Sequence, residues 1–216
     1  MRTAVVYVHG LWVGGWETAW LRARVARVIG GESHAFDYRS VSGTIDDHAA
    51  GLARFLTSLH ADTLHLVAHS LGGIVILECF ERHLRQAPLP PGRAVFLGTP
   101  VRGSEAAQRL ARFRFGTALL GRAAREVLLA PRAYRWTADR DLGVIAGDLA
   151  VGFGRLMGKL PQPSDGTVMV GETDLPGAKQ RLVMPVSHTG LVLSATVARQ
   201  VAVFLRDGRF ENGPAA

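Results

Sequence analysis

Short runs rich in apolar residues recur along this chain, and the segments between them are longer and amphipathic. Six of these runs predict strands: Ala4 to Val8, His34 to Tyr38, Thr63 to Ala68, Arg93 to Leu97, Gly143 to Gly147 and Gln180 to Pro185. The first run is continuously apolar, which is typical of a parallel strand buried on both faces. The second run is more polar and predicts a weaker strand.

The segments between the runs predict helices, for example Trp16 to Ile29 and Leu191 to Leu205. Thr44 precedes another helix that extends to about Leu59, and its hydroxyl is suited to cap the first turn. Strands alternating with helices predict a doubly wound α/β fold. We therefore expect one domain over residues 1–216, with a mostly parallel sheet covered by helices on both faces.

The polar candidates for chemistry all follow a predicted strand. His9 and Gly10 follow the first strand, Ser70 the third, Asp165 the fifth and His188 the sixth. In an open parallel sheet, ligands bind outside the carboxyl ends of the strands, where the strand order reverses. We therefore expect these residues, far apart in the sequence, to meet at one site.

Residues 68–73, Ala-His-Ser-Leu-Gly-Gly, predict a very tight turn between a strand and a helix. In a Gly-x-Ser-x-Gly turn of this kind, the serine adopts a strained conformation that exposes its hydroxyl. Small residues flank it because the strand and helix backbones come close; Gly72 fits this need, and Ala68 departs from it by one methyl group. Ser70 is the candidate nucleophile, and the alternative is an ordinary serine in a Gly-rich connection.

A serine hydroxyl becomes a strong nucleophile only when a base removes its proton and a carboxylate orients that base. In chains with this turn, the acid and then the histidine follow the serine. His188 lies after the last predicted strand, and Asp165 precedes it in a Ser-Asp-Gly-Thr-Val turn. We predict a catalytic set of Ser70, Asp165 and His188, with Asp148 and Asp174 as alternative acids.

The oxyanion formed by attack on a carbonyl needs hydrogen-bond donors. Enzymes with this turn use the backbone N–H of the residue after the nucleophile and one from an early loop. These are Leu71 and Leu11 here, and each such donor typically contributes about 2.7–4 kcal/mol to the transition state. His9, Gly10 and Trp12 are expected to shape this loop and to contact the substrate.

The formal charge of +7 comes almost entirely from arginine, since Lys159 and Lys179 are the only lysines. No basic run with interleaved aromatics, zinc-finger spacing or RNP-like segment accompanies this charge, which argues against nucleic-acid binding. No histidine pair has metalloprotease spacing and no dinucleotide fingerprint opens a helix, so we expect no metal and no cofactor. The single Cys79 cannot form an internal disulfide.

The apolar runs of this chain are short. None approaches the ~18 residues of a membrane-spanning helix. The first residues lead directly into a strand and lack the apolar region of a secretory signal. We expect a cytoplasmic protein.

Together these segments resemble the α/β-hydrolase family, in particular its small bacterial lipases and esterases. The resemblance is carried by His9-Gly10, residues 68–73, residues 97–100 with 102–104, residues 164–168 and residues 186–191. It implies a six-stranded sheet in spatial order 2-1-3-4-5-6, which lacks the family's first two strands. It also implies an insertion after the fourth strand that serves as a lid.

The residues and the resemblance favour a serine-dependent hydrolase of lipophilic carboxylic esters that forms an acyl-enzyme. Leu11, Trp12 and the apolar side of the lid are expected to line an acyl pocket. A thioesterase, phospholipase or acyltransferase uses the same machinery and stays an alternative. A non-catalytic ligand-binding protein with a hydrolase fold is a second alternative.

The expected lid spans residues 101–140 and holds two predicted helical segments. It carries nine arginines against three acidic residues, and its apolar residues are Leu110, Phe113, Phe115, Leu119 and Leu120. Either the apolar side packs on the body while arginine faces water, or the basic helices attract anionic lipid or substrate. The second interpretation predicts a weak association with a membrane surface.

Overall fold

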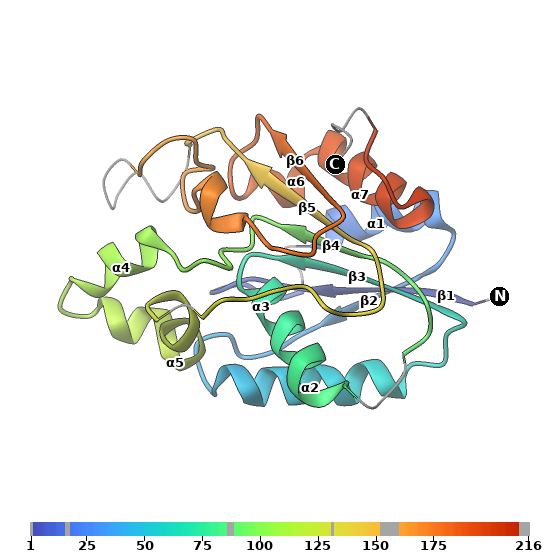
Figure 1. The fold of residues 1–216 in the computed structure, drawn as a ribbon, viewed down its shortest axis with the longest axis horizontal. Helices are drawn as coiled ribbons and strands as arrows, with labels where there is room; N and C mark the ends of the chain where they lie inside the picture. The colour runs from blue at the N-terminus through green and yellow to red at the C-terminus, as the bar shows by residue number, and fades with distance from the viewer. Residues whose placement is uncertain (1, 16–17, 86–88, 131, 152–159, 212–216) are drawn as a thin grey trace.

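The structure is a computed structural model that describes residues 2–15, 18–85, 89–130, 132–151 and 160–211 of the 216-residue chain. The described residues form six strands: β1 (Thr3–Val8), β2 (Glu32–Phe36), β3 (Thr63–His69), β4 (Ala94–Leu97), β5 (Leu142–Gly147) and β6 (Gln180–Met184). They make one sheet in the order β2-β1-β3-β4-β5-β6, and all neighbouring strands are parallel (Figure 1). The predicted fold class and strand order are confirmed.

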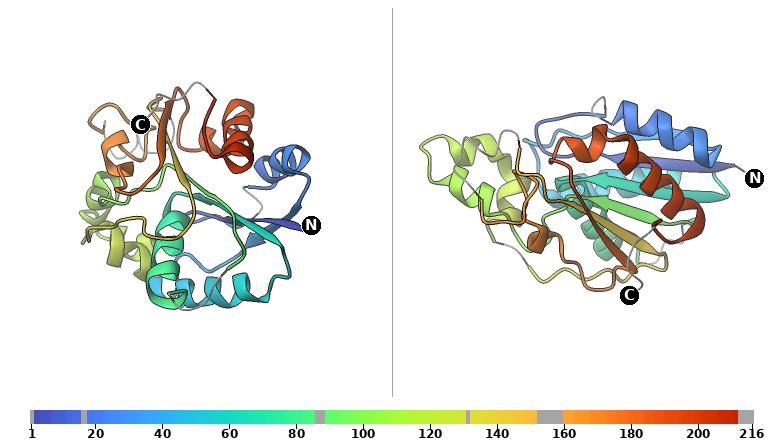
Figure 2. Two further views of the ribbon diagram at one scale, coloured as in Figure 1. Left: turned by 45° about the vertical axis from the view of Figure 1, so that its right-hand side comes forward. Right: turned by 90° about the horizontal axis from the view of Figure 1, so that it is seen from above.

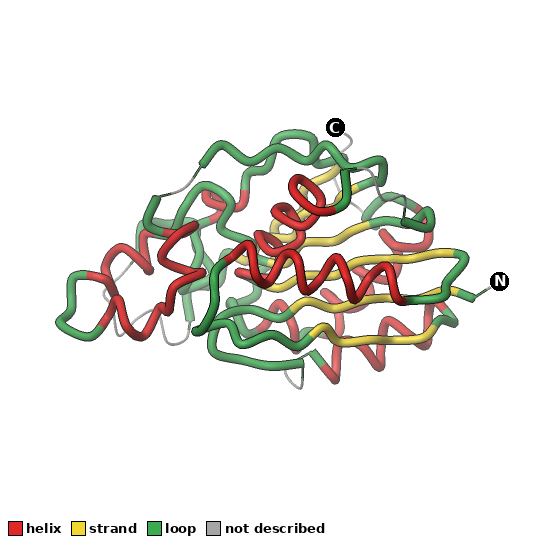
Figure 3. The backbone as a smooth tube through the Cα atoms, turned by 90° about the horizontal axis from the view of Figure 1, so that it is seen from below, coloured by secondary structure: helices red, strands yellow, loops and turns green. Residues whose placement is uncertain are grey.

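Helices cover both faces of this sheet. They are α1 (Ala19–Ile29), α2 (Ile45–Ser58), α3 (Leu71–Glu78), α4 (Glu105–Ala111), α5 (Gly116–Leu128), α6 (Gly190–Leu193) and α7 (Ala195–Asp207). A π-helical turn, Cys79–His83, continues α3, and a 3-10 helix covers Val170–Thr173. α1 and α7 lie side by side on one face (Figure 2), and α2 and α3 pack on the other, which Figure 3 views from outside.

β1 shows why its sequence is apolar at every position. Val6 and Val8 belong to the core beneath α2 and α3, whereas Val5 and Tyr7 belong to the core beneath α1 and α7. Successive side chains of a strand point to opposite faces. A strand between two helical layers therefore has no polar face.

β2 begins and ends two residues earlier than predicted. It is the edge strand, paired with β1 from Ala4 and Glu32 onward, and its side chains are only partly buried. Apolar content therefore does not mark its bounds. Tyr38, expected in the strand, lies beyond it and contacts His9 at the carboxyl edge of the sheet. The predicted start of the first helix, Trp16, lies outside the described residues.

The segment 101–140 contains α4 and α5, which lie beyond the carboxyl ends of the strands (Figure 1). Leu110 and Leu120 are buried, whereas Phe113, Phe115 and Leu119 are exposed. The apolar residues of this segment therefore divide into an inner set that joins the core and an outer set that faces solvent. No helix in the described ranges has the length and apolar character needed to span a bilayer.

Candidate active site

Ser70 occupies the tight turn between β3 and α3, with φ 53° and ψ −124°. A non-glycine residue in such a conformation costs about 1–3 kcal/mol, so the surroundings must hold it there. The Ser70 N–H donates to Leu97 O on β4 at 2.9 Å, and Ser70 O accepts from Gly73 N at 3.1 Å. The turn is thus anchored both to the neighbouring strand and to the first turn of α3.

Close backbone packing explains the glycines after Ser70. A Cβ on Gly72 would overlap Val8 O and would lie 2.6 Å from His9 O, which belong to the end of β1. A Cβ on Gly73 would overlap the Thr99 side chain. The requirement for a small residue at position 72, inferred from the sequence, follows from this crossing of α3 over the end of β1.

His188 lies on the loop between β6 and α6, and Asp165 lies in a turn of the long segment between β5 and β6. The Nδ1 atom of His188 is 2.7 Å from Asp165 Oδ2, and Asp165 Oδ1 accepts from the N–H groups of Thr167 and Val168. Burial acts to raise the pKa of Asp165, but the His188 imidazole and these N–H donors outweigh it and lower that pKa below its ordinary value. An ionised Asp165 can only accept a hydrogen bond, so His188 Nδ1 carries the proton and donates it. Nε2 of His188 is then the nitrogen that can act as a base.

The two other candidate acids lie elsewhere. Asp148 is exposed, and its backbone N–H donates to Met184 O. Asp174 pairs with Arg102 at 2.5 Å and lies 3.8 Å from Arg181. Asp165 is therefore the carboxylate among these three that the structure brings to His188.

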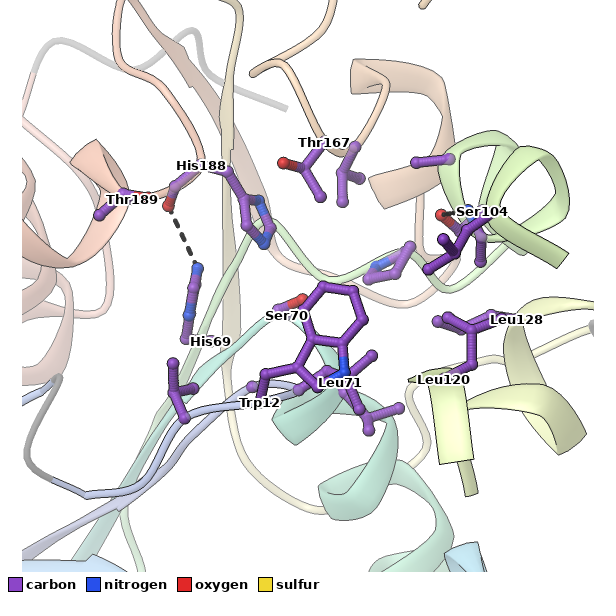
Figure 4. A pocket seen from close by; sticks show the side chains of 18 residues that line it. Trp12, His69, Ser70, Leu71, Ser104, Leu120, Leu128, Thr167, His188 and Thr189 are labelled. Atoms are coloured by element: carbon purple, nitrogen blue, oxygen red, sulfur yellow. Dashed lines mark hydrogen bonds between the residues drawn. The ribbon is translucent and has the colours of Figure 1, made fainter. Parts of the chain in front are cut away.

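Ser70 and His188 line the same cavity, which has a volume of about 220 Å³. Figure 4 shows the imidazole of His188 directed toward the Ser70 side of this cavity. Leu11, Trp12 and Leu71 form part of its wall, and Leu110, Leu120 and Leu128 of α4 and α5 form another part. None of the described lining residues is Asp, Glu, Lys or Arg.

The loop after β1 also borders the cavity. A Cβ on Gly10 would lie 3.0 Å from Ser70 Cβ, so this glycine lets the loop approach the turn closely. Trp12 has φ 64°, unusual for a large residue, and its backbone N–H donates to Ser40 Oγ at 3.1 Å. Its indole Nε1 donates to Leu119 O of α5 at 2.7 Å.

His9 is not at the cavity, contrary to the expected substrate contact. Its side chain is 1% exposed, its Nδ1 bonds to Gly10 O at 2.8 Å, and its Nε2 accepts from Tyr38 N at 3.2 Å. A carbonyl can only accept, so Nδ1 carries the proton of a neutral ring. The ring of His9 therefore binds the loop from the side away from the cavity lining.

Two further residues at the site belong to motifs noted in the sequence, but neither was predicted as a site residue. Gly98 has φ +56°, and a Cβ there would lie 3.2 Å from both Asp165 Oδ2 and His188 Cε1. His69 lines the cavity, and its Nε2 is 3.2 Å from His188 O. The sequence gives only a weak signal at either position, because the residues that Gly98 and His69 contact lie far away in the sequence.

No cluster of metal-ligating side chains is present among the described residues. The arrangement instead provides a strained serine, an imidazole fixed by a buried carboxylate, and an apolar cavity beside both. Such a set can activate a hydroxyl for attack on an electrophilic carbon.

The chain matches a known protein family over most of its length. A model of a family described as the alpha/beta hydrolase family matches residues 5–206. The search of curated proteins found no match.

Solved structures resemble this fold. The mature form of the Bacillus licheniformis lipase BlEst2 has a TM-score of 0.68 at 20% identity, covering 95% of this chain and 91% of that one. The metagenomic carboxyl esterase MGS0156 has a TM-score of 0.62 at 21% identity, covering 86% and 64%. The lin2722 product of Listeria innocua has a TM-score of 0.63 at 14% identity, covering 100% and 98%. At these identities the likeness concerns the fold alone.

Proposed function

Because the chain belongs to the alpha/beta hydrolase family, we propose that it is a serine hydrolase that cleaves carboxylic esters through an acyl-enzyme. The observation that carries this proposal is the 2.7 Å contact of His188 with the buried Asp165, at the same cavity as the strained Ser70. A non-catalytic binding protein has no need for this arrangement.

In this mechanism, Ser70 Oγ attacks the ester carbonyl carbon while His188 Nε2 takes the hydroxyl proton. Asp165 stabilises the imidazolium that results and keeps the ring oriented. The oxyanion accepts hydrogen bonds from the backbone N–H groups of Leu11 and Leu71. His188 then protonates the departing alkoxide, and a water molecule activated by the same imidazole releases the acid from Ser70.

The cavity supports an uncharged, apolar acyl group as the bound part of the substrate. Its lining holds no Asp, Glu, Lys or Arg among the described residues, and it includes five leucines. Its volume of about 220 Å³ exceeds the roughly 150 Å³ of a dry cavity that holds benzene. The site therefore fits an acyl chain of moderate length better than acetyl. Thioesters and phospholipids, or transfer to an acceptor alcohol, would use the same residues.

The test combines a fluorophosphonate probe with p-nitrophenyl esters of graded chain length and acyl-CoA thioesters. We expect stoichiometric labelling of the protein, loss of labelling in Ser70→Ala, and a drop in turnover on the order of 10⁶-fold. Ser58→Ala, which changes an exposed serine on α2, is the matched control and should leave both readouts unchanged. Failure of the folded protein to react with the probe would favour a ligand-binding role.

We also propose that the connection between α4 and α5, together with the first turn of α5, contacts an anionic lipid surface. Phe113, Phe115 and Leu119 are 60%, 66% and 54% exposed. Arg112 and Arg114 flank Phe113 in the chain and are exposed as well. Apolar side chains with neighbouring arginines complement a bilayer that carries negative headgroups.

This contact can be measured without any turnover. Ser70→Ala protein should sediment with phosphatidylglycerol vesicles more than with phosphatidylcholine vesicles, and should do so less at high salt. Phe115→Ser should weaken the association. Equal sedimentation with both lipids would refute the proposal. A lid role for residues 101–140 and a cytoplasmic location stay predictions.

A further inference from the structure

His69 is the last residue of β3 and directly precedes Ser70. Its side chain is buried and lines the cavity. Its Nε2 lies 3.2 Å from the backbone carbonyl oxygen of His188, 119 residues further along the chain (Figure 4). A single side chain thus links the strand that carries the nucleophile to the loop that carries the base.

The chemistry of this contact fixes the direction of the hydrogen bond. A carbonyl oxygen can only accept, so His69 Nε2 carries the proton and donates it. The backbone N–H of His188 in turn donates to Asp165 O at 3.0 Å. The main chain of His188 is therefore held on its N–H side by Asp165 and on its carbonyl side by His69.

The rings of His69 and His188 are also in contact. Their centroids are 4.6 Å apart with an interplanar angle of 40°. Together with the Asp165 bond to Nδ1, this contact limits how far the His188 ring can tilt within the cavity.

We propose that His69 is a positioning residue, whose ring N–H holds the backbone of His188 so that the base faces Ser70. The proposal rests on the proposed function, in which His188 must reach the Ser70 hydroxyl. His69 itself exchanges no proton in the reaction. Its effect is geometric, and a displacement of about 1 Å at a reacting group can lower a rate by about 10²-fold.

The experiment compares two variants at position 69. His69→Phe keeps a ring of similar shape but removes the donor, and we expect kcat to fall about 10- to 100-fold with little change in KM. His69→Gln carries an amide N–H at nearly the same distance from the backbone, and we expect it to recover most of kcat. Thermal unfolding of each variant checks that the fold is intact, and His69→Leu replaces His69→Phe if the latter does not fold.

The outcomes separate this inference from the proposed function. If the wild type is labelled at Ser70 and His69→Phe is as active as wild type, the positioning role is wrong while the hydrolase proposal stands. The role is equally wrong if the donor-free and donor-bearing variants lose the same activity. If the wild type reacts with neither probe nor esters, the proposed function fails first, and the positioning role fails with it.

Discussion

The two ends of β3 each carry a buried histidine, and the two residues have different tasks. At the amino end, His65 Nδ1 accepts a hydrogen bond from Arg93 N at 3.0 Å. At the carboxyl end, His69 Nε2 donates to His188 O beside the cavity. The two histidines are on the same strand and are similarly buried. One binds the backbone directly before β4, and the other binds the backbone of a candidate active-site residue.

The difference arises from what surrounds each end of the sheet. At the amino end, the Arg140 guanidinium donates to Leu64 O and Pro90 O, and the backbone of Gly92 packs directly against Leu64. At the carboxyl end, the loops after β1 and β6 and the turn after β3 border a cavity of about 220 Å³. Parallel sheets generally place ligands at this second end. Changes at the carboxyl end should therefore alter activity, and changes at the amino end should alter stability.

The largest expected effect is at the carboxyl end. Asp165→Asn should lower kcat by about 10⁴-fold, because an amide can hold His188 in the wrong tautomer while leaving the fold intact. Asp148→Asn, which changes an exposed side chain, should leave kcat unchanged. Steady-state kinetics of the two variants decide the matter, and an equal loss in both would show that the acid has been wrongly assigned.

The amino end should respond in stability. Gly92→Ala places a Cβ into Leu64 O and 2.6 Å from Leu64 C, so the backbone must shift, and we expect a loss of about 3 kcal/mol in the free energy of unfolding. Gly171→Ala is the control, because its Cβ would meet nothing within 4 Å. Urea unfolding measures both variants. If folded Gly92→Ala lost more kcat than Gly171→Ala, the amino end of the sheet would affect activity as well as stability, contrary to this prediction.

His65 should make stability depend on pH. Burial, with the nearby Arg93 and Arg140, lowers the pKa of His65 to about 4 from an ordinary value of about 6.5. Below pH 6.5 the unfolded chain binds a proton at His65 that the folded chain does not bind. The free energy of unfolding should therefore fall by about 3 kcal/mol toward pH 4. Well above pH 6.5, His65 is neutral in both the folded and the unfolded chain, so it no longer makes stability depend on pH.

His65→Asn isolates this dependence. The asparagine carbonyl can still accept from Arg93 N, but the side chain no longer titrates. Urea unfolding between pH 4 and 7 should show a shallower slope for this variant than for the wild type. Identical slopes would mean that other groups, such as His48, account for the pH dependence.

The smallest effect is expected outside both ends. Phe115 of the α4–α5 segment is 66% exposed, so Phe115→Ser should change the free energy of unfolding by less than about 0.5 kcal/mol. Ester hydrolysis in solution should also be unchanged. A substantial loss of stability would show that this phenylalanine packs against the protein in solution.

The sequence was most informative where one rule applies to many residues. All strands are parallel, so every loop that follows a strand reaches the same edge. The order of motifs along the chain then predicted His188 as the base and Asp165 as its acid, with Asp148 and Asp174 left as alternatives, and the structure brings Asp165 to His188. The strand order could likewise be predicted, although the bounds of the half-buried edge strand β2 could not.

Packing details were beyond sequence-based prediction. An exposed phenylalanine such as Phe113 and a buried leucine such as Leu110 look alike in an apolar pattern, because the pattern does not show which side chains find a partner. The bond between His69 and His188 joins the end of β3 to a loop 119 residues further along the chain. His9 lies beneath the loop rather than in the cavity, and it contacts Tyr38 there. This contact could not be predicted, because Tyr38 was expected inside β2 and the strand ends at Phe36.

The indole of Trp12 joins the loop after β1 to Leu119 of α5 at 2.7 Å. An outward swing of α5 must either break this bond or drag the loop that carries the Leu11 amide with it. Grafting residues 101–140 from another hydrolase would meet the same constraint, since the graft would bring a foreign backbone against a native tryptophan. A chimera that exchanges the helices and residues 10–13 together should keep a matched contact between the loop and α5. A chimera that exchanges only the helices should lose that contact.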